Sequence, residues 1–453
     1  MNSLDLLFNP ESITLIGASH TVEKLGGVIL RNLLRFKGEV YPVNPKYTEL
    51  MGMRSYKSIK DIPRSFDLAI IMRPAPEVPE ILRELRGRCS IAVIMSSGFA
   101  EIGETGLQNE TKRIAKDTGI RILGPNCMGI YNPYKKLDVF FLPYERLQRP
   151  KKGNVAVVSQ SGAILSCLLG SLKASNTGVS KVVGYGNALD IDESEIYEYL
   201  YEDKDTDAVI SYIESLSDGR KFIGKAKALS EKKALIVLKS GKSPSGQAAA
   251  FSHTGRLAGS YEVFHSIFRQ YGIREAADFD ELMDATKALS YYPSLPPLSK
   301  GLREGGSRVC IITNGGGSGV LAADECMRQG LEVAALPDDK KRRLLKVFPH
   351  FYGINNPLDL TAQVKDEDYL NALNELKDDY EGFLVIALAN VLGITGQLAE
   401  MINDSKANIN KPIVFHIARG GISGRLSASL ERSGIPVYPS PERAVRGLKA
   451  LLT

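Results

Sequence analysis

The chain has 453 residues with 43% hydrophobic and 24% charged residues, an ordinary globular composition that allows roughly two to four domains. The net charge of +5 is too small and too dispersed to indicate a nucleic-acid partner, and no apolar window approaches the roughly 20 residues of a membrane span. Five cysteines stand far apart without a CxxC pair, which predicts reduced thiols in a cytoplasmic protein and no metal site.

Apolar runs typical of buried strands alternate with helical patterns along the whole chain. The N-terminal residues 1–10 carry Asp5 and no basic region, so they do not predict a secretory signal. Strand alternation with helices predicts an α/β fold with doubly wound parallel sheets. The predicted strands occupy residues 13–17, 40–43, 68–72, 91–95, 155–159, 209–213, 235–239, 309–313, 383–387 and 413–416.

Two polar segments rich in proline and glycine divide this alternation. They lie at residues 143–153 (PYERLQRPKKG) and 291–306 (YYPSLPPLSKGLREGG). Such composition is typical of linkers between domains. The sequence therefore predicts three domains, at residues 1–145, 150–292 and 305–453.

The first predicted strand ends in Gly17-Ala18-Ser19, before a helix that we expect from about Lys24. A glycine there lets the backbone approach a phosphate at the helix N-terminus. The G-x-G-x-x-G fingerprint is absent, and the second strand ends in Asn44-Pro45-Lys46 instead of the acidic residue that holds the ribose of NAD. These features disfavour an NAD-dependent oxidoreductase and favour coenzyme A, whose ribose carries an extra phosphate. A Rossmann-like domain without a ligand is the alternative.

Two later loops of this domain also carry small and amide side chains. One contains Ser96, Ser97 and Gly98, and the other contains Gly124-Pro125-Asn126. Because ligands bind at the carboxyl ends of the strands in such sheets, these loops argue against an empty domain.

The middle and third predicted domains each open on a strand followed by a glycine-rich helix start. The first of these turns comprises Ser159, Gln160, Ser161 and Gly162. The second comprises Asn314, Gly315, Gly316, Gly317 and Ser318. Helix N-termini stabilise negative charge, so each turn is a candidate phosphate site. Glycine that serves packing alone is the alternative for each turn.

His253 lies in a run of small residues, 240–255, where an imidazole can meet a ligand. Histidine can act as a nucleophile toward phosphoryl groups, although a solvated loop histidine would look the same. Glu214 follows the strand 209–213 and could hold the second imidazole nitrogen, or it could be a solvated charge. The triplet at 241–243 (GKS) is not a P-loop, because Ile236 stands where the first glycine is required.

Taken together in this order, the motifs resemble those of one known family. They are Gly17-Ala18-Ser19, Lys24-Leu25-Gly26-Gly27, Val43-Asn44-Pro45-Lys46, Ser97-Gly98-Phe99, Gly124-Pro125-Asn126-Cys127, Ser159-Gln160-Ser161-Gly162, Ser252-His253-Thr254-Gly255, the run 313–319 and Asn356-Pro357-Leu358-Asp359. The chain resembles the α subunit of the NDP-forming acyl-CoA synthetases, most closely the archaeal-type ADP-forming acetyl-CoA synthetases, which are relatives of succinyl-CoA synthetase. The resemblance covers essentially the whole chain.

The resemblance implies an N-terminal Rossmann-like CoA-binding domain followed by two flavodoxin-like domains. It implies that His253 is the phosphorylated nucleophile, Glu214 is its partner, and the two glycine-rich turns face the phosphate. The implied CoA contacts are Gly17, Ala18, Ser19, Lys24, Val43, Asn44, Pro45, Lys46, Met72, Pro74, Ser96, Ser97, Gly98 and Asn126, with Asn126 toward the acyl end.

The family's reaction interconverts acyl-CoA, phosphate and ADP with acid, CoA and ATP through an acyl phosphate and a phosphohistidine. All three predicted domains are accounted for without an ATP-grasp module, so the resemblance implies a β subunit that brings ADP/ATP and Mg²⁺, in an α2β2 complex. A non-catalytic CoA-binding regulatory protein is the alternative. Such a protein would need neither a reactive histidine nor two phosphate-facing turns.

Overall fold

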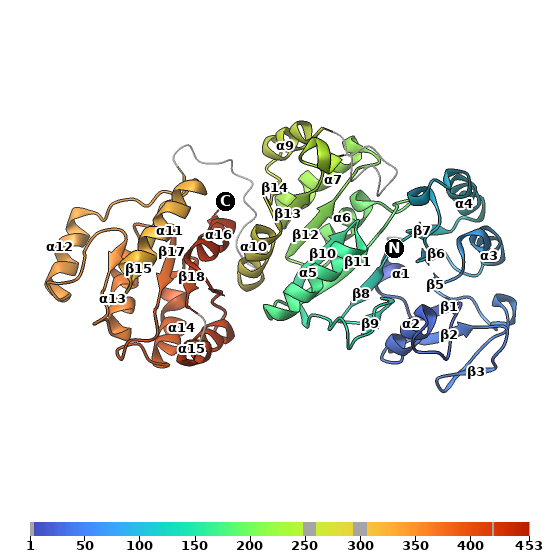
Figure 1. The fold of residues 1–453 in the computed structure, drawn as a ribbon, viewed down its shortest axis with the longest axis horizontal. Coiled ribbons are helices and arrows are strands. Elements are labelled where there is room, and N and C mark those ends of the chain that lie inside the picture. Colours follow the sequence, from blue (N-terminus) through green and yellow to red (C-terminus); the bar gives the residue numbers. More distant parts are fainter. Residues whose placement is uncertain (1–3, 248–259, 293–305, 419–420, 453) are drawn as a thin grey trace. The chain divides into compact units, whose positions relative to one another are not determined.

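The computed structural model describes residues 4–247, 260–292, 306–418 and 421–452. These residues form three main sheets covered by helices, two of them parallel and the middle one mixed, within two compact units, Met1–Ala277 and Asp278–Thr453. In Figure 1 the first sheet is blue, the middle sheet is mostly green, and the third is orange and red. In these ranges no helix has both the length and the apolar character that crossing a membrane requires.

The first sheet has five parallel strands in the order β2-β1-β5-β6-β7. Alternate residues of β5 and β6 belong to two different core clusters, so both faces of the sheet are covered and the strands read as continuous apolar runs. Helix α2 (Leu25–Leu33) packs on one face, and helices α3 (Val78–Glu84) and α4 (Thr105–Thr118) pack on the other. The strands are β1 (Ser12–Ile16), β2 (Glu39–Val43), β5 (Leu68–Ile71), β6 (Ile91–Ile94) and β7 (Arg121–Leu123); α1 (Asp5–Phe8) and the hairpin β3 (Glu49–Leu50) and β4 (Met53–Arg54) complete the domain.

The middle sheet has seven strands in the order β14-β13-β12-β10-β11-β8-β9. Strand β8 pairs antiparallel with β11, so a segment that follows the last strand of the first sheet completes the middle one. The two sheets accordingly share one core cluster. The strands are β8 (Gly129–Asn132), β9 (Leu137–Asp138), β10 (Lys152–Ser159), β11 (Val179–Gly184), β12 (Ala208–Ile213), β13 (Ala234–Lys239) and β14 (Arg274–Glu275); the helices are α5 (Gly162–Ala174), α6 (Glu193–Glu202), α7 (Gly219–Lys232) and α9 (Tyr261–Gln270).

The third sheet lies in the second unit, with the order β16-β15-β17-β18-β19. Helix α10 packs against α16 in this unit, where the Arg443 guanidinium contacts the buried Asp284 carboxylate at 2.7 Å. The strands are β15 (Val309–Thr313), β16 (Leu358–Asp359), β17 (Gly382–Ile386), β18 (Ile413–His416) and β19 (Val437–Tyr438). The helices are α10 (Phe279–Tyr291), α11 (Gly316–Arg328), α12 (Asp338–Val347), α13 (Asp366–Leu376), α14 (Gln397–Ile409), α15 (Gly421–Arg432) and α16 (Pro441–Leu452).

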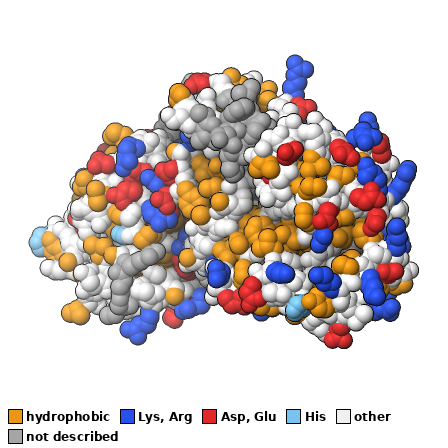
Figure 2. Space-filling view, turned by 45° about the vertical axis from the view of Figure 1, so that its right-hand side comes forward, with side chains coloured by type: hydrophobic (Ala, Val, Ile, Leu, Met, Phe, Trp, Pro, Cys, Tyr) orange, Lys and Arg blue, Asp and Glu red, His pale blue; other side chains and the backbone are white. Residues whose placement is uncertain are grey.

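The parallel strands of all three sheets follow the order 2-1-3-4-5 in their own sequence numbering. The predicted α/β class with doubly wound parallel sheets is confirmed. On the face of the molecule in Figure 2, basic and acidic side chains are interspersed, as the modest net charge predicts. The three predicted domain ranges stay predictions.

Candidate active site

The carboxyl ends of the first and third strands form the switch point of a sheet with the order 2-1-3-4-5. Connections leave these two neighbouring strands toward opposite faces, so a crevice opens there for a ligand. The switch points here follow β1 and β5, then β10 and β12, and finally β15 and β17. The glycine turns predicted from the sequence lie at these three places.

At the first switch point, the turn after β1 needs glycine at position 17. Gly17 has φ of +94°, and a side chain there would collide with the carbonyl of Met72. The Asn44 side chain at the end of β2 donates from Nδ2 to the Ala18 carbonyl oxygen at 2.7 Å and accepts from the Lys46 amide at 2.9 Å. The structure therefore brings the turn at 17–19 and the strand end at 43–46 together, and the side chains of Lys24 and Lys46 are exposed.

The loops after β5, β6 and β7 meet beside this turn. The Ser96 hydroxyl donates to the Arg73 carbonyl oxygen, and the Ser96 carbonyl oxygen accepts from the Asn126 amide at 2.9 Å. Asn126 adopts a left-handed φ of +54° and Gly98 one of +110°. Three loops that are distant in sequence are thus joined through Ser96, by one side-chain and one backbone hydrogen bond. These loops carry the predicted contacts Met72, Pro74, Ser96, Ser97, Gly98 and Asn126.

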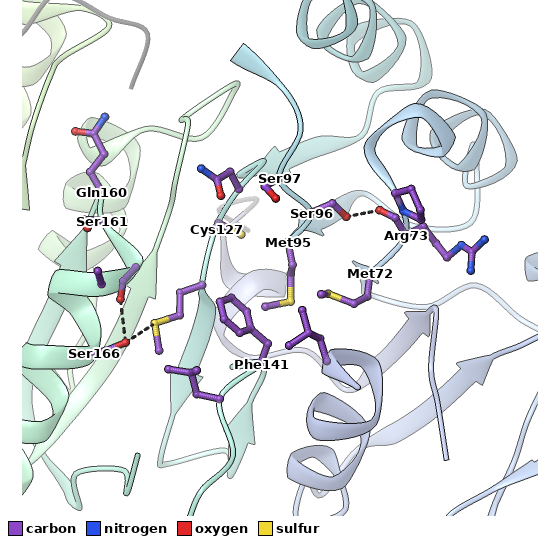
Figure 3. A pocket seen from close by; sticks show the side chains of 17 residues that line it. Met72, Arg73, Met95, Ser96, Ser97, Cys127, Phe141, Gln160, Ser161 and Ser166 are labelled. Atoms are coloured by element: carbon purple, nitrogen blue, oxygen red, sulfur yellow. Dashed lines mark hydrogen bonds between the residues drawn. The ribbon is translucent and has the colours of Figure 1, made fainter. Parts of the chain in front are cut away.

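A cavity of about 630 Å³ opens between these loops and the start of α5. In Figure 3, Ser161 lies across the cavity from Ser96 and Ser97, and the Gln160 side chain points away from them. The wall between the two polar ends is apolar, which suits a ligand with a polar group at each end and a neutral segment between them. Its apolar members include Leu25, Met72, Met95, Met128, Phe141 and Leu142.

The turn before α5 is built from buried polar side chains. Ser161 caps the helix, its Oγ accepting from the Ile164 amide at 3.4 Å. The Ser159 hydroxyl donates to the Ser161 carbonyl oxygen at 2.7 Å. Gly162, the first residue of α5, lines the cavity with Ser161, so the N-terminus of this helix faces the cavity.

Gln160 joins this turn to the end of β12. Its Oε1 accepts from the backbone amides of Glu214 at 2.9 Å and Ser215 at 3.0 Å, and its Nε2 donates to the Ser215 hydroxyl at 3.2 Å. Glu214 is buried. The structure thus brings two predicted elements, the turn at 159–162 and Glu214, to one switch point.

Lys239 lies next to Glu214 at the end of β13. Its ammonium donates to the carbonyl oxygens of Glu214 at 2.8 Å and Ser240 at 2.5 Å. Burial lowers the pKa of this lysine to about 8. The ammonium fixes the strand ends at the point where the chain leaves for residues 240–255. His253 itself lies outside the described residues.

The turn before α11, in the second unit, has a similar construction without a capping side chain. The Asn314 amide accepts from the Leu388 amide at 2.8 Å and donates to the Leu388 carbonyl at 3.3 Å, which joins β15 to the end of β17. The helix cap is Gly315. Gly316 and Gly317 are exposed, and the Asp359 carboxylate lies close to Gly316.

The cysteine in the cavity wall is not suited to nucleophilic chemistry. Burial raises the pKa of the Cys127 thiol to about 12, so the thiol stays protonated near neutral pH. Among the described residues, no group of three or more histidine, cysteine or carboxylate side chains could hold a metal ion.

Sequence reasoning predicted only Met72 of the apolar wall as a contact, and it missed two polar side chains that contact the Gly98 and Asn126 loops, Glu101 and Asn187. Asn187 donates to Glu101 at 2.6 Å, and Glu101 accepts from the Gly98 amide at 2.5 Å. Residues 184–190 read GYGNALD, and the glycines with an asparagine indicated a turn. Nothing local in the sequence indicated that this turn reaches the first sheet.

Three family models match the chain in succession. They are a CoA binding domain at residues 11–133, a succinyl-CoA ligase like flavodoxin domain at residues 152–289 and a ligase-CoA domain at residues 309–450. The fold and the site therefore define a protein of the CoA-ligase class, with a CoA-binding sheet placed before two flavodoxin-like sheets.

The similarity to characterised proteins extends over the full chain. The chain is 38% identical to the α subunit of acetate–CoA ligase [ADP-forming] II of Pyrococcus furiosus, over 99% of this chain and 97% of that protein. It is 39% identical to the acetate–CoA ligase [ADP-forming] of Methanocaldococcus jannaschii, covering 98% of this chain and 62% of that longer protein. The chain belongs to the ADP-forming acetate–CoA ligase family, and corresponds to the α subunit.

A solved structure supports this assignment. The dinucleotide-forming acetyl-coenzyme A synthetase 1 of Ca. Korarchaeum cryptofilum, in complex with phosphate and ADP, superposes with a TM-score of 0.89 at 34% identity. The match covers 100% of this chain and 96% of the Korarchaeum chain. The predicted family membership is confirmed.

Proposed function

We propose that this chain is the α subunit of an ADP-forming acyl-CoA synthetase that acts on acetyl-CoA or a similar small acyl-CoA. The reaction interconverts acyl-CoA, ADP and phosphate with acid, CoA and ATP. The observation that carries the proposal is the cavity between the first sheet and α5. Loops predicted to bind CoA and a helix N-terminus predicted to bind phosphate line the same enclosed space.

The residues around the first switch point fit coenzyme A, which is a substrate here. The exposed ammonium groups of Lys24 and Lys46 flank the joined turn of Gly17 and Asn44, where the nucleotide phosphates would lie. From there the neutral pantetheine arm would follow the apolar wall toward Asn126. The polar side chain of Asn126 lines the same cavity as Ser161 and Gly162.

In the first step, a phosphate at the N-terminus of α5 attacks the acyl carbonyl. A carbon–oxygen bond forms, the carbon–sulfur bond breaks, and CoA leaves as the thiolate, which then takes up a proton. The α5 dipole and the amides of its first turn stabilise the anionic phosphate and the developing charge. The products of this step are acyl phosphate and CoA.

In the second step, a nitrogen of His253 attacks the phosphorus of the acyl phosphate. The phosphorus–oxygen bond to the acyl group breaks, and the acid leaves as a carboxylate. Glu214 would accept a hydrogen bond from the other imidazole nitrogen and stabilise the charge that forms on the ring. The buried position of Glu214 at the second switch point supports this role.

A partner subunit with an ATP-grasp fold would bring ADP and Mg²⁺ to the phosphohistidine, in a cytoplasmic α2β2 complex. The names and lengths of the relatives support a partner. The Pyrococcus relatives are named as α subunits, whereas the Methanocaldococcus relative is a longer single chain. All five cysteines are free thiols, as expected in a reducing compartment. The turn before α11 would face the phosphate during transfer.

The proposal is tested by a half reaction. The purified chain, given acetyl-CoA and phosphate without ADP, should become phosphorylated on His253, and native mass spectrometry at neutral pH should detect the adduct. His253→Ala should remove the label and leave CoA binding intact, and Glu214→Gln should slow labelling. Robust ATP synthesis by the chain alone would refute the need for a partner. Labelling at another residue would overturn the role of His253.

A further inference from the structure

The segment Asn187–Ile191, which follows β11 in the middle sheet, lies along the end of the first sheet. Three of its backbone amides donate to carbonyls of residues 122–125, at 2.9, 2.9 and 3.0 Å. The preceding Gly186 has φ of +58°, and a side chain there would collide with the backbone of Asn126. The middle domain thus contacts the loop that carries Asn126.

The Asn187 side chain continues these contacts. Its Nδ2 donates to Glu101 at 2.6 Å and to Gln108 at 3.1 Å, and its Oδ1 accepts from the Asn126 side chain at 3.4 Å. A carboxylate can only accept, so the amide nitrogen of Asn187 must face Glu101. This leaves the amide oxygen of Asn187 facing Asn126.

The second oxygen of Glu101 holds the neighbouring loop. Its Oε1 accepts from the backbone amides of Gly98 at 2.5 Å and Phe99 at 3.2 Å. Burial acts to raise the pKa of Glu101, but the hydrogen bonds from Asn187 and these amides outweigh it, so the pKa is lowered and the group is ionised near neutral pH. A continuous chain of hydrogen bonds therefore runs from Gly98 to Asn126.

We propose that Asn187, acting with Glu101, is a positioning residue that holds the Ser96–Gly98 loop and Asn126 in the arrangement that binds CoA. The proposal rests on the proposed function, because it assumes that CoA occupies this cavity. Ser96, Ser97 and Asn126 line the cavity, whereas Asn187 and Glu101 are not among its lining residues. Asn187 therefore acts through the residues that touch the ligand.

The charges around Asn187 allow its positioning role to be tested by varying the pH. Glu101 is the charged group that contacts the Asn187 side chain. Asp190 on the same segment and Glu195 on α6 are paired with Arg121 at 2.8 and 2.5 Å. A second carboxylate at position 187 would therefore face Glu101 without a compensating cation in contact.

The decisive variant is Asn187→Asp, tested by calorimetric titration of CoA into the purified chain at pH 8 and pH 6. At pH 8 the new carboxylate repels Glu101 and cannot donate to it, so we expect CoA affinity to fall about tenfold relative to wild type at the same pH. At pH 6 the two carboxylates can share a proton, so the loss of CoA affinity relative to wild type should be smaller. The double variant Asn187→Asp/Glu101→Gln exchanges amide and carboxylate, restores the donor–acceptor pair and should recover affinity at both pH values.

Asn154→Asp is the matched control. Asn154 donates to the Asp207 carboxylate at 3.0 Å near the opposite end of β10, so this substitution makes the same change away from the cavity. It should leave CoA affinity unchanged. If Asn187→Asp binds CoA as wild type does, or if its loss is equal at both pH values and is not recovered by the double variant, the positioning role is wrong. If wild type itself does not bind CoA, the proposed function fails instead.

Discussion

The parallel strands of the middle and third sheets follow the same order, and the first strand of each sheet ends in a turn of similar construction. The hydroxyl of the last strand residue donates to a backbone carbonyl two residues on, in Ser159 and in Thr313. The next side chain, Gln160 or Asn314, bridges to the end of the third strand. The same scaffold therefore supports both helix N-termini.

The two turns differ in what surrounds the first helical turn. Before α5, Ser161 caps the helix and the N-terminus lines a cavity. Before α11, the cap residue is Gly315, which has no side chain to accept a hydrogen bond, and the carboxylate of Asp359 lies beside Gly316. A carboxylate at a helix N-terminus interacts with the same positive end that would attract a phosphate. We therefore expect the N-terminus of α5 to attract phosphate more strongly than that of α11 in the free chain.

The largest stability effect should come from Gln160→Ala. Two buried backbone amides, of Glu214 and Ser215, would lose their acceptor, and the free energy of unfolding should fall by about 2–4 kcal/mol. Urea titration measures this loss. Gln160→Glu keeps the acceptor oxygen and should cost less. Equal stability of Gln160→Ala and wild type would show that the bridge does not stabilise the turn.

Lys239, at the end of β13, should make the free energy of unfolding depend on pH in the alkaline range. Its pKa is lowered from 10.5 to about 8, so between these values the unfolded chain holds a proton that the folded chain has lost. The free energy of unfolding should therefore rise with pH across this window, by about 3 kcal/mol, relative to Lys239→Met. Urea titrations of both proteins from pH 7.5 to 10.5 test this, and parallel curves would contradict it.

Asn314→Ala tests the equivalent bridge in the third sheet. One backbone amide, that of the partly exposed Leu388, loses its acceptor, and we expect a loss of about 1–2 kcal/mol. Asn314→Asp retains the acceptor and serves as the control. A loss as large as that of Gln160→Ala would mean that the two bridges are energetically equivalent.

Substituting alanine for the first residue of each helix should change stability in opposite directions at the two turns. At Gly316 the new Cβ would lie 2.9 Å from the Asp359 carboxylate, whereas at Gly162 the nearest atom is 3.6 Å away on Met128. We expect Gly316→Ala to destabilise and Gly162→Ala to be neutral or stabilising, each within about 1 kcal/mol. Thermal unfolding measures the signs, and identical signs would contradict the contrast.

The smallest effect is expected at His416, which ends β18 as Lys239 ends β13. Burial lowers the pKa of His416 below its usual 6.5, and the hydrogen bond with the Tyr438 carbonyl offsets only part of this decrease. Below pH 6.5 the unfolded chain binds a proton before the folded chain does, so stability should fall as the pH falls through this range. His416→Gln should lack this loss, as urea titration at pH 5 to 7 would show.

The sequence by itself determined most of the parallel strands, though not, among others, β7 or β11, together with the α/β class and the glycine turns. Apolar runs and glycine reflect burial and backbone conformation residue by residue. It also indicated the family through ordered motifs. The CoA contacts, the phosphate turns, Glu214 and His253 stay predictions that the titration and labelling experiments test.

The tertiary structure alone decided which of these residues meet. Local pattern does not encode a hydrogen-bond partner that lies 54 residues away, as Glu214 does from Gln160, or 61 residues away, as Asn187 does from Asn126. Those pairings arise from sheet order, since the third strand is placed beside the first only when the sheet is assembled. The antiparallel return of β8 to β11 likewise brings the turn after β11 against the first sheet, behind the loop that carries Asn126.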